Sequence, residues 1–452
     1  MNRFGIVLGA GMGTRMKSTV PKVLHEVMGK SMIEHVITAL EKTNVEEVVV
    51  VTGHKSELVE ARLKDRVKYA KQEEQLGTAH AVMMADSLLA GKNGMTMITY
   101  GDDPLLDEDI LAQVFSKHEN SNSKMTLLTN IVANPFGLGR IIRAESGEII
   151  KITEQKDATE AELLITEINT GIACFDNDLL FKALKLVGNN NAQQEYYLTD
   201  LVEIIKNMGH NIESVVIDNL DGALGVNDRI QMANNARILR DRINIKHMEN
   251  GVTLLDPFTT YIESDVIIGN DVIIEPNVHL KGNTVVKSNA FIGTGSYLTN
   301  ASIGEGAHIL SSYITSSSVG ANTTVGPFAH LRDHAQIGKR VRIGNFVEVK
   351  KSVLADEVKA AHLAYMGDSD IGARSNISCG VITANYDGKK KHKTIIGEDV
   401  MIGSNVNLVA PVVVENNAYV AAGSTITKNV PEDALAIARS KQEIKAGYAK
   451  KI

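Results

Sequence analysis

The sequence predicts an α/β domain with a mostly parallel sheet, followed by a parallel β-helix of hexapeptide repeats. Short apolar runs alternate with helical patterns up to about residue 226, as they do in a parallel sheet that helices cover on both faces. After Gly251 an aliphatic residue recurs at six-residue steps, which is typical of a parallel β-helix. An aromatic content of 4% and 37 glycines also favour tightly coiled β structure.

The strands expected in the first half are short and uniformly apolar, at 5–8, 47–52 and 95–100. Helical patterns at 31–42 and 78–89 lie between them. Ligands of open parallel sheets bind at the carboxyl ends of the strands, so we look for chemistry in the loops that follow these runs.

A single long helix is expected over 227–250, and Gly251 has the position of its C-cap. Its predicted apolar face consists of Ile230, Ala233, Ala236, Ile238, Leu239 and Ile243. The predicted domain division is therefore 1–226, a helical linker at 227–250, and 251–452.

The six-residue step predicts which aliphatic residues stack inside the β-helix. It first runs through Ile262, Ile268, Ile274, Leu280, Val286, Ile292 and Leu298. It resumes over 319–349 and over 396–426, with shorter steps between 298 and 314. Neither a helix period of 3.6 nor the alternation of a sandwich fits this pattern. The polar stretch 385–393 cannot form one side of a coil, so we expect a protruding loop there.

Composition excludes several classes of protein. A net charge of −7 and a pI near 6.0 argue against nucleic-acid binding. We find no apolar run near the roughly 18 residues that span a membrane, and no signal peptide, so a cytoplasmic protein without membrane insertion is expected. Cys174 and Cys379 lack disulfide or metal spacing, and we expect both to be buried free thiols.

A glycine-rich loop, Leu8-Gly9-Ala10-Gly11-Met12-Gly13-Thr14-Arg15-Met16, follows the first strand, and Pro21-Lys22 comes shortly after it. Glycines let backbone N–H groups approach a phosphate, and Arg15 and Lys22 would add positive charge. The loop is neither a dinucleotide fingerprint, which needs Gly where Thr14 stands, nor a Walker loop. Taken alone, it could equally be a plain strand-to-helix turn.

The sequence of this loop resembles that of the sugar nucleotidyltransferases. Gln75-Leu76-Gly77-Thr78 and Tyr100-Gly101-Asp102 follow it in the order that this group shows. Together with the hexapeptide half, the whole chain resembles the family of bifunctional N-acetylglucosamine-1-phosphate uridylyltransferase / glucosamine-1-phosphate acetyltransferase enzymes. The resemblance implies a left-handed β-helix, a homotrimer, Mg²⁺ as cofactor, and glucosamine-1-phosphate, acetyl-CoA and UTP as substrates.

The resemblance also implies roles for residues of the N-terminal site. Arg15 and Lys22 would neutralise charge as the α-phosphorus is attacked, and Asp102 and Asn227 would hold Mg²⁺. The residues implied for UDP-sugar binding are Leu8, Gly9, Ala10, Gly11, Lys22, Gln72, Gly77, Thr78, Gly139, Glu154, Asn169 and Asn227. Gln72 and Gly77 would read uracil, and Gly139, Glu154 and Asn169 the acetamidosugar. A turn aspartate is the alternative for Asp102, since Asp103-Pro104 follows, and Asp103 adds charge beside the predicted metal.

For the C-terminal site, His362 is the predicted general base, because amide formation needs a group that accepts the proton of the amine. On composition alone a single histidine is more often structural, and the segment 361–368 carries the resemblance to the acetyltransferases. The implied glucosamine-1-phosphate ligands are Arg332, Lys350, Tyr365 and Asn376. The implied acetyl-CoA ligands are Cys379, Asn385, Tyr386, Ser404, Ala422 and Arg439.

Some alternatives stay open at this point. The basic run Lys389–Lys393 is interpreted first as a solvated loop tip, and second as a contact with ligand phosphates. The whole chain could be a nucleotidyltransferase whose β-helix only assembles it, or a silent scaffold that binds sugar nucleotides. The presence of Lys22, Asp102 and His362 together favours the bifunctional enzyme.

Overall fold

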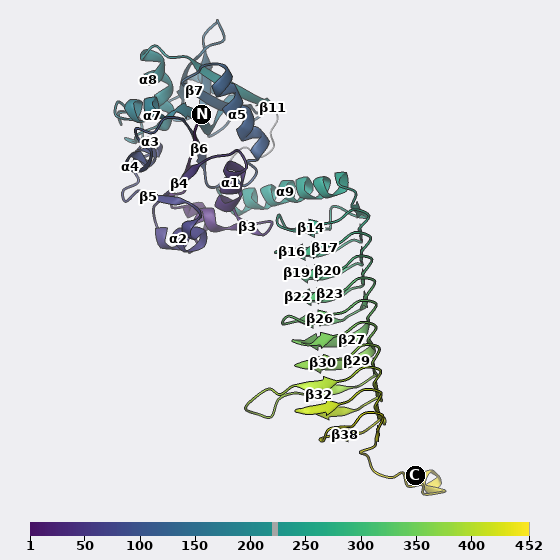
Figure 1. Cartoon of the computed structure of the whole chain (residues 1–452). Helices are drawn as coiled ribbons and strands as arrows, with labels where there is room; N and C mark the ends of the chain where they lie inside the picture. The colour runs from purple at the N-terminus through teal and green to yellow at the C-terminus, as the bar shows by residue number, and fades with distance from the viewer. Residues whose placement is uncertain (219–224, 452) are drawn as a thin grey trace. The chain divides into compact units, whose positions relative to one another are not determined.

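The computed structural model describes residues 1–218 and 225–451 (Figure 1). The chain forms two compact units, Met1–Leu239 and Arg240–Ile452. The division between them falls inside one helix, α9 (Arg229–Glu249).

The first unit is built on a nine-stranded sheet whose main path runs β11-β7-β10-β6-β1-β4-β5. All neighbours on this path are parallel except β10, which is antiparallel to both β6 and β7. A short antiparallel pair, β8 and β9, extends from β10. The strands of this unit are β1 (Arg3–Leu8), β2 (Glu26–Val27), β3 (Lys30–Ser31), β4 (Glu47–Thr52), β5 (Lys68–Lys71), β6 (Met95–Tyr100), β7 (Met125–Ile131), β8 (Arg140–Arg143), β9 (Ile149–Thr153), β10 (Glu167–Asp176) and β11 (Ile212–Asp218).

Helices cover both faces of this sheet, because successive residues of a strand point to opposite sides. On β1, Ile6 packs into the core that α3, α4, α7 and α8 complete, while Val7 packs into the core that α1, α2 and α5 complete. The helices are α1 (Met32–Glu41), α2 (Ser56–Leu63), α3 (Thr78–Met83), α4 (Asp86–Leu89), α5 (Glu108–Asn120), α6 (Glu160–Leu163), α7 (Asn177–Leu184) and α8 (Leu201–Asn207).

The strands predicted at 47–52 and 95–100 are β4 and β6, and the run at 5–8 is part of β1. The helix predicted over 78–89 is wrong in one respect, since the segment forms two short helices, α3 and α4. The break leaves Ala85 fully buried, and tertiary packing here overrides the helical pattern.

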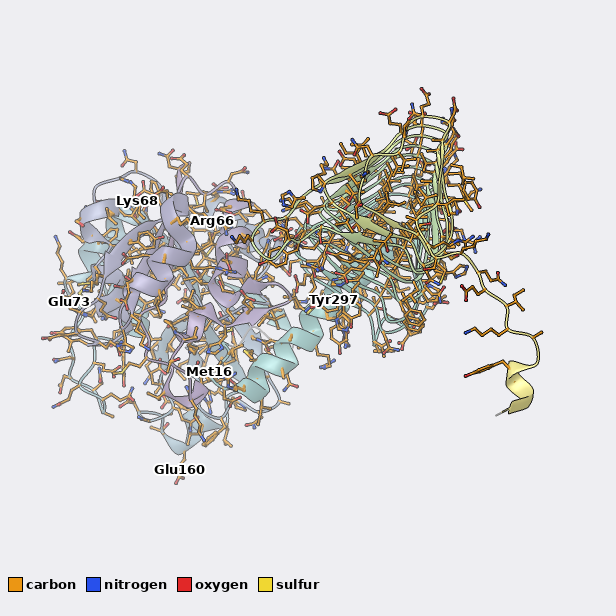
Figure 2. All side chains as sticks on the ribbon, turned by 90° about the horizontal axis from the view of Figure 1, so that it is seen from below. Met16, Arg66, Lys68, Glu73, Glu160 and Tyr297 are labelled. Carbon is orange, nitrogen blue, oxygen red and sulfur yellow. The ribbon has the colours of Figure 1, made fainter. Side chains whose placement is uncertain are left out.

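The second unit is a left-handed parallel β-helix of stacked coils, and its side chains radiate from a three-sided outline when the coils are seen end-on (Figure 2). Its strands form three stacks by their register. The first stack contains β12 (Thr253–Leu254), β15 (Ile273–Ile274), β18 (Phe291–Ile292), β21 (His308–Ile309), β24 (Thr324–Val325), the start of β27 (Arg342–Lys350), the start of β29 (Lys359–Gly367), β31 (Asn376–Ile377), β34 (Met401–Ile402), β37 (Tyr419–Val420) and β39 (Leu435–Ala436).

The second stack contains β13 (Tyr261–Ile262), β16 (His279–Lys281), β19 (Tyr297–Thr299), β22 (Tyr313–Thr315), β25 (His330–Arg332), the ends of β27 and β29, β32 (Ile382–Ala384), β35 (Asn407–Val409) and β38 (Thr425–Ile426). The third contains β14 (Ile267–Ile268), β17 (Val285–Val286), β20 (Ser302–Ile303), β23 (Ser318–Val319), β26 (Gln336–Ile337), β28 (Val353–Leu354), β30 (Ser369–Ile371), β33 (Thr394–Ile396) and β36 (Val412–Val414). The strands β27 and β29 run through the corner between the first two stacks.

The aliphatic residues predicted from the six-residue step form the core of this unit. Every one of them, from Ile262 to Ile426, is buried in a single cluster. Tyr297, labelled in Figure 2, belongs instead to an outer ladder of the second stack, where its ring lies 5.6 Å from that of His279 and 5.5 Å from that of Tyr313.

The long helix predicted at 227–250 is present as α9, but its predicted apolar face is wrong in part. Ile230 is 76% exposed, whereas Arg240 and Asn244 are buried. These two polar side chains donate to backbone carbonyls of the first coil, Arg240 to Phe258 at 2.8 Å and Asn244 to Thr260 at 3.0 Å. Hydrogen bonds to a loop therefore decide which face is buried, and apolar periodicity does not record them.

None of the helices in the described part of the chain is long and apolar enough to cross a membrane. Cys174 is buried as expected, but the expectation for Cys379 is wrong, because it lies exposed at a corner of the β-helix.

Candidate active sites

A cavity of about 820 Å³ opens at the carboxyl ends of the strands in the first unit. Every residue predicted for the N-terminal site lines it: Leu8, Gly9, Ala10, Gly11, Arg15, Lys22, Gln72, Gly77, Thr78, Asp102, Gly139, Glu154, Asn169 and Asn227. Those from the first part of the unit lie at the carboxyl ends of β1, β5 and β6 or in the loops after them, which the parallel order of these strands brings to one edge. Gly139 follows β7, Glu154 follows β9 and Asn169 lies within the antiparallel strand β10, while Asn227 comes just before α9.

The glycine-rich loop is held in place where it leaves β1. The N–H of Gly9 donates to the Val51 carbonyl at 2.9 Å, and Gln75 Nε2 donates to the Ala10 carbonyl at 2.6 Å. Gly13 has a φ of +59°, and a Cβ there would lie 2.6 Å from Lys22 Cβ. Glycine is therefore required at this position for both its backbone conformation and the close approach of Lys22.

Asp102 and Asn227 lie side by side, although 125 positions separate them in the sequence. The Val226 N–H donates to the Asp102 carbonyl at 2.8 Å, which places Asn227 next to Asp102. The ammonium of Lys22 contacts the Asp102 carboxylate and lies 3.4 Å from Asn227 Oδ1, which also accepts from Arg15 Nη2 at 2.8 Å. Oxygens of Asp102 and Asn227 thus converge on a cation.

The far wall of the cavity carries Gly139, Glu154 and Asn169. The Asn169 N–H donates to the Gly139 carbonyl at 2.9 Å, and a Cβ on Gly139 would lie 3.4 Å from Glu154 Oε1. Burial raises the pKa of the Glu154 carboxyl, against the hydrogen bond that Thr199 donates to it at 3.3 Å. Asp103, which also lines the cavity, is buried and accepts the Leu105 N–H at 3.3 Å, so it fixes the turn after Asp102.

His362 lies on the second unit, at the corner where β29 turns from the first stack to the second. It is exposed, and its Nδ1 lies 3.1 Å from Asn345 Oδ1 on the preceding coil. An amide oxygen can only accept, so Nδ1 carries the proton of the neutral ring and Nε2 keeps a free lone pair. The same corner carries predicted acetyl-CoA residues on successive coils: Cys379, Ser404, Ala422 and Arg439.

Three of the predicted glucosamine-1-phosphate ligands lie together on adjacent coils of the second stack. Arg332 pairs with Lys350 in the register, and Tyr365 follows on the next coil. Arg332 forms ion pairs with Glu348 at 2.6 Å and with Asp333 at 3.1 Å. The fourth, Asn376, lies on the first stack, where it pairs with Lys359, so the register of one chain does not place it beside the other three.

Comparison with known proteins assigns both units. Residues 4–220 match the model of the nucleotidyl transferase family, and residues 265–300, 316–351 and 393–428 match that of the bacterial transferase hexapeptide repeats. A protein of Exiguobacterium described as bifunctional protein GlmU is 50% identical over 451 residues, which cover 100% of both chains. The chain belongs to the GlmU family. Proteins of the same description from Listeria welshimeri and Clostridium perfringens are 49% and 50% identical, over 100% of this chain and 98% and 99% of theirs.

Membership in the GlmU family makes the chain a bifunctional enzyme, a uridylyltransferase and an acetyltransferase. The predicted resemblance is thereby confirmed, as is the predicted fold of both halves.

Sequence reasoning missed Asn345 in this GlmU-family chain, named Gln75 only as part of a motif, and named Lys391 only within the basic run 389–393. Gln75 ties the glycine-rich loop to the loop after β5, and Asn345 fixes the tautomer of His362. Lys391, from the protruding basic loop, faces Lys350, whose positive charge lowers the pKa of the Lys391 ammonium. The six-residue step could not identify Asn345, because it lies 17 residues before His362 and three such steps span 18.

The loop 385–393 protrudes as predicted, and it is ordered by Asp387. This carboxylate accepts the N–H groups of Lys389 and Lys390 at 2.7 Å each and lies 2.6 Å from His392 Nε2. These contacts lower the pKa of Asp387. At the base of the loop, Asn385 Nδ2 donates to Asp368 Oδ2 at 2.6 Å, while Tyr386 is 62% exposed.

Proposed function

We propose that this enzyme makes UDP-N-acetylglucosamine in two steps. The C-terminal site acetylates glucosamine-1-phosphate with acetyl-CoA, and the N-terminal site then transfers UMP from UTP to N-acetylglucosamine-1-phosphate and releases pyrophosphate. The observation that carries the proposal is the convergence of all predicted N-terminal residues on one cavity of about 820 Å³. We assign uridylyl transfer to 1–226 and acetyl transfer to 251–452, with 227–250 as the linking helix.

In the N-terminal site, the backbone N–H groups of Leu8 to Gly11 would bind phosphate oxygens. Arg15 and Lys22 would offset the negative charge that develops as the sugar phosphate attacks the α-phosphorus. Gly139, Glu154 and Asn169 would hold the acetamidosugar on the opposite wall. Positioning and electrostatics supply most of the catalysis in such a transfer, because the protein forms no bond to the phosphorus.

Asp102 and Asn227 are the proposed Mg²⁺ ligands. The donor set fits, because a carboxylate and an amide oxygen suit a hard cation and both already face the Lys22 ammonium. Magnesium, when bound, would offset charge on the phosphates of UTP. Lys22 would then be free to contact a phosphate oxygen.

In the C-terminal site, His362 Nε2 would take the proton of the glucosamine amine as that amine attacks the thioester carbonyl. The carbonyl carbon gains the C–N bond, the C–S bond breaks, and coenzyme A leaves as the thiol after taking up a proton. Asn345 would keep Nε2 unprotonated and aimed at the substrate. Cys379, Ser404, Ala422 and Arg439 would line the acetyl-CoA channel together with Asn385 and Tyr386.

Arg332 and Lys350 would bind the phosphate of glucosamine-1-phosphate, with Tyr365 and Asn376 on the sugar. The repulsion between Lys350 and Lys391 favours an anion between them. This supports the second interpretation of the basic loop, a contact with ligand phosphate, for Lys391 alone.

We also propose that the enzyme is a cytoplasmic homotrimer. The exposed apolar side chains Phe328, Phe346 and Leu363, at 61%, 58% and 57% exposure, follow one another beside His362. The rings of Phe328 and Phe346 stack with centroids 5.6 Å apart. A neighbouring subunit that covers this column would also enclose the exposed acetyltransferase residues and could bring an Asn376 to the other ligands.

The test is mass spectrometry of products after mixing the protein with glucosamine-1-phosphate, acetyl-CoA, UTP and Mg²⁺, with each component omitted in turn. UDP-N-acetylglucosamine should form only when all four are present. If it forms only from ready-made N-acetylglucosamine-1-phosphate, the β-helix assembles the enzyme without acetylating this substrate.

A further inference from the structure

The side-chain amide of Gln72 is held by two acceptors behind the wall of the N-terminal cavity. Gln72 directly follows β5, is 4% exposed and lines the cavity. Its Nε2 lies 3.1 Å from the Gly77 carbonyl oxygen and 3.0 Å from His80 Nδ1, on helix α3.

These two contacts settle the orientation of the amide. A carbonyl oxygen only accepts hydrogen bonds, so the NH₂ group of Gln72 faces Gly77, and Oε1 points the other way. Because Nε2 is a donor, His80 Nδ1 must be the acceptor, and the neutral ring carries its proton on Nε2. Both amide hydrogens are therefore in use, and within residues 1–218 and 225–451 no hydrogen bond is made to Gln72 Oε1.

A base that meets Gln72 consequently meets an acceptor. Uracil carries a hydrogen on N3 and can donate to such an oxygen, whereas N3 of cytosine carries a lone pair that the oxygen repels. The sequence predicts only that Gln72 reads the base, and the structure leaves the acceptor of its amide for that contact.

We propose that His80 is a positioning residue that selects UTP over CTP, by accepting a hydrogen bond from the Gln72 amide and so turning Gln72 Oε1 toward N3 of the base. The proposal rests on the proposed function of the cavity. His80 acts through Gln72, and it is absent from the lining of the cavity. Its ring lies 6.3 Å from that of Tyr196, so packing alone is the alternative role.

The test compares kcat/KM for UTP and for CTP in the full-length enzyme, from pyrophosphate release with N-acetylglucosamine-1-phosphate and Mg²⁺. His80→Phe keeps the ring against Tyr196 and removes the acceptor, whereas His80→Asn keeps an acceptor at the position of Nδ1. His210→Phe is the matched control, because His210 is absent from the cavity lining. Acetyl transfer by each variant reports whether the chain is folded.

We expect His80→Phe to lower the UTP-to-CTP ratio of kcat/KM about tenfold, the effect of one lost hydrogen bond on discrimination, and His80→Asn to restore most of it. A role in packing would lower the efficiency with both nucleotides in proportion, so an unchanged ratio in His80→Phe would overturn the proposal. Failure of His80→Asn to restore the ratio would overturn it as well. Wild-type enzyme that releases no pyrophosphate from UTP would instead overturn the function proposed for the cavity.

Discussion

Replacing Asn345 by alanine should slow acetyl transfer without weakening substrate binding. Asn345 Oδ1 accepts the proton of His362 Nδ1 at 3.1 Å, which leaves His362 Nε2 as the base. In Asn345→Ala the imidazole can carry its proton on either nitrogen and can rotate. Arg332 and Lys350, the proposed phosphate ligands, are unchanged in this variant.

The size of the effect follows from this one contact. A hydrogen bond between neutral groups contributes about 1 kcal/mol, or roughly fivefold in rate, and the loss of the tautomer preference adds a further factor of about two to five. We therefore expect kcat for acetyl transfer to fall about 10- to 25-fold in Asn345→Ala. Removal of the base itself in His362→Ala should cost on the order of 10² to 10⁴.

The assay is release of free thiol from acetyl-CoA at varied glucosamine-1-phosphate, with uridylyl transfer as the internal control. Asn345→Asp supplies a second test, because a carboxylate that accepts from Nδ1 favours protonated histidine and should move the pH–rate profile of kcat upward. An unchanged kcat in Asn345→Ala, or a loss confined to KM, would refute the assignment of Asn345 as the residue that positions His362.

Three further predictions concern individual charges. Glu154→Gln should raise the free energy of unfolding at pH 7 to 8, because burial raises the pKa of this carboxyl and its ionised form opposes folding above that pKa. Chemical denaturation at a series of pH values should show that this gain in stability becomes smaller as the pH falls. The same variant should lower kcat/KM for N-acetylglucosamine-1-phosphate. His118 is buried beside Thr126 with its pKa lowered from 6.5 to about 4, so the unfolded chain takes up a proton first on acidification. Stability should accordingly fall by about 3 kcal/mol between pH 6.5 and 4, a loss that urea titrations of His118→Gln should not show. Lys391→Ala should raise KM for glucosamine-1-phosphate about tenfold by removing one cation beside the phosphate, whereas Lys389→Ala should leave this KM unchanged. Equal effects of the two substitutions would favour the first interpretation of the basic run, a solvated loop tip.

The β-helix could be predicted almost residue by residue, because each coil buries the same position of its repeat. Successive sides of a coil each bury one aliphatic residue, as Ile262 of the second stack and Ile268 of the third show, so a period read from the sequence is also a period of burial. The N-terminal cavity was predictable for a related reason. Parallel strands end at one edge, and residues after separate strands meet there whatever their separation in the chain.

Contacts between polar side chains could not be predicted in the same way. The buried face of α9 depends on hydrogen bonds from Arg240 and Asn244 to a loop, which no apolar pattern records. The pairing of Asn345 with His362 depends on the irregular corner of β27 and β29. The approach of Lys391 to Lys350 depends on how the loop folds around Asp387.

The central claim is that one chain carries two separate active sites, and a mixing experiment tests it most directly. Asp102→Ala should abolish pyrophosphate release and keep acetylation, and His362→Ala should do the reverse. Neither variant alone should convert glucosamine-1-phosphate, acetyl-CoA and UTP into UDP-N-acetylglucosamine, whereas an equimolar mixture of the two purified variants should produce it. Loss of both activities in either variant, or a mixture that stays inactive, would contradict two independent sites.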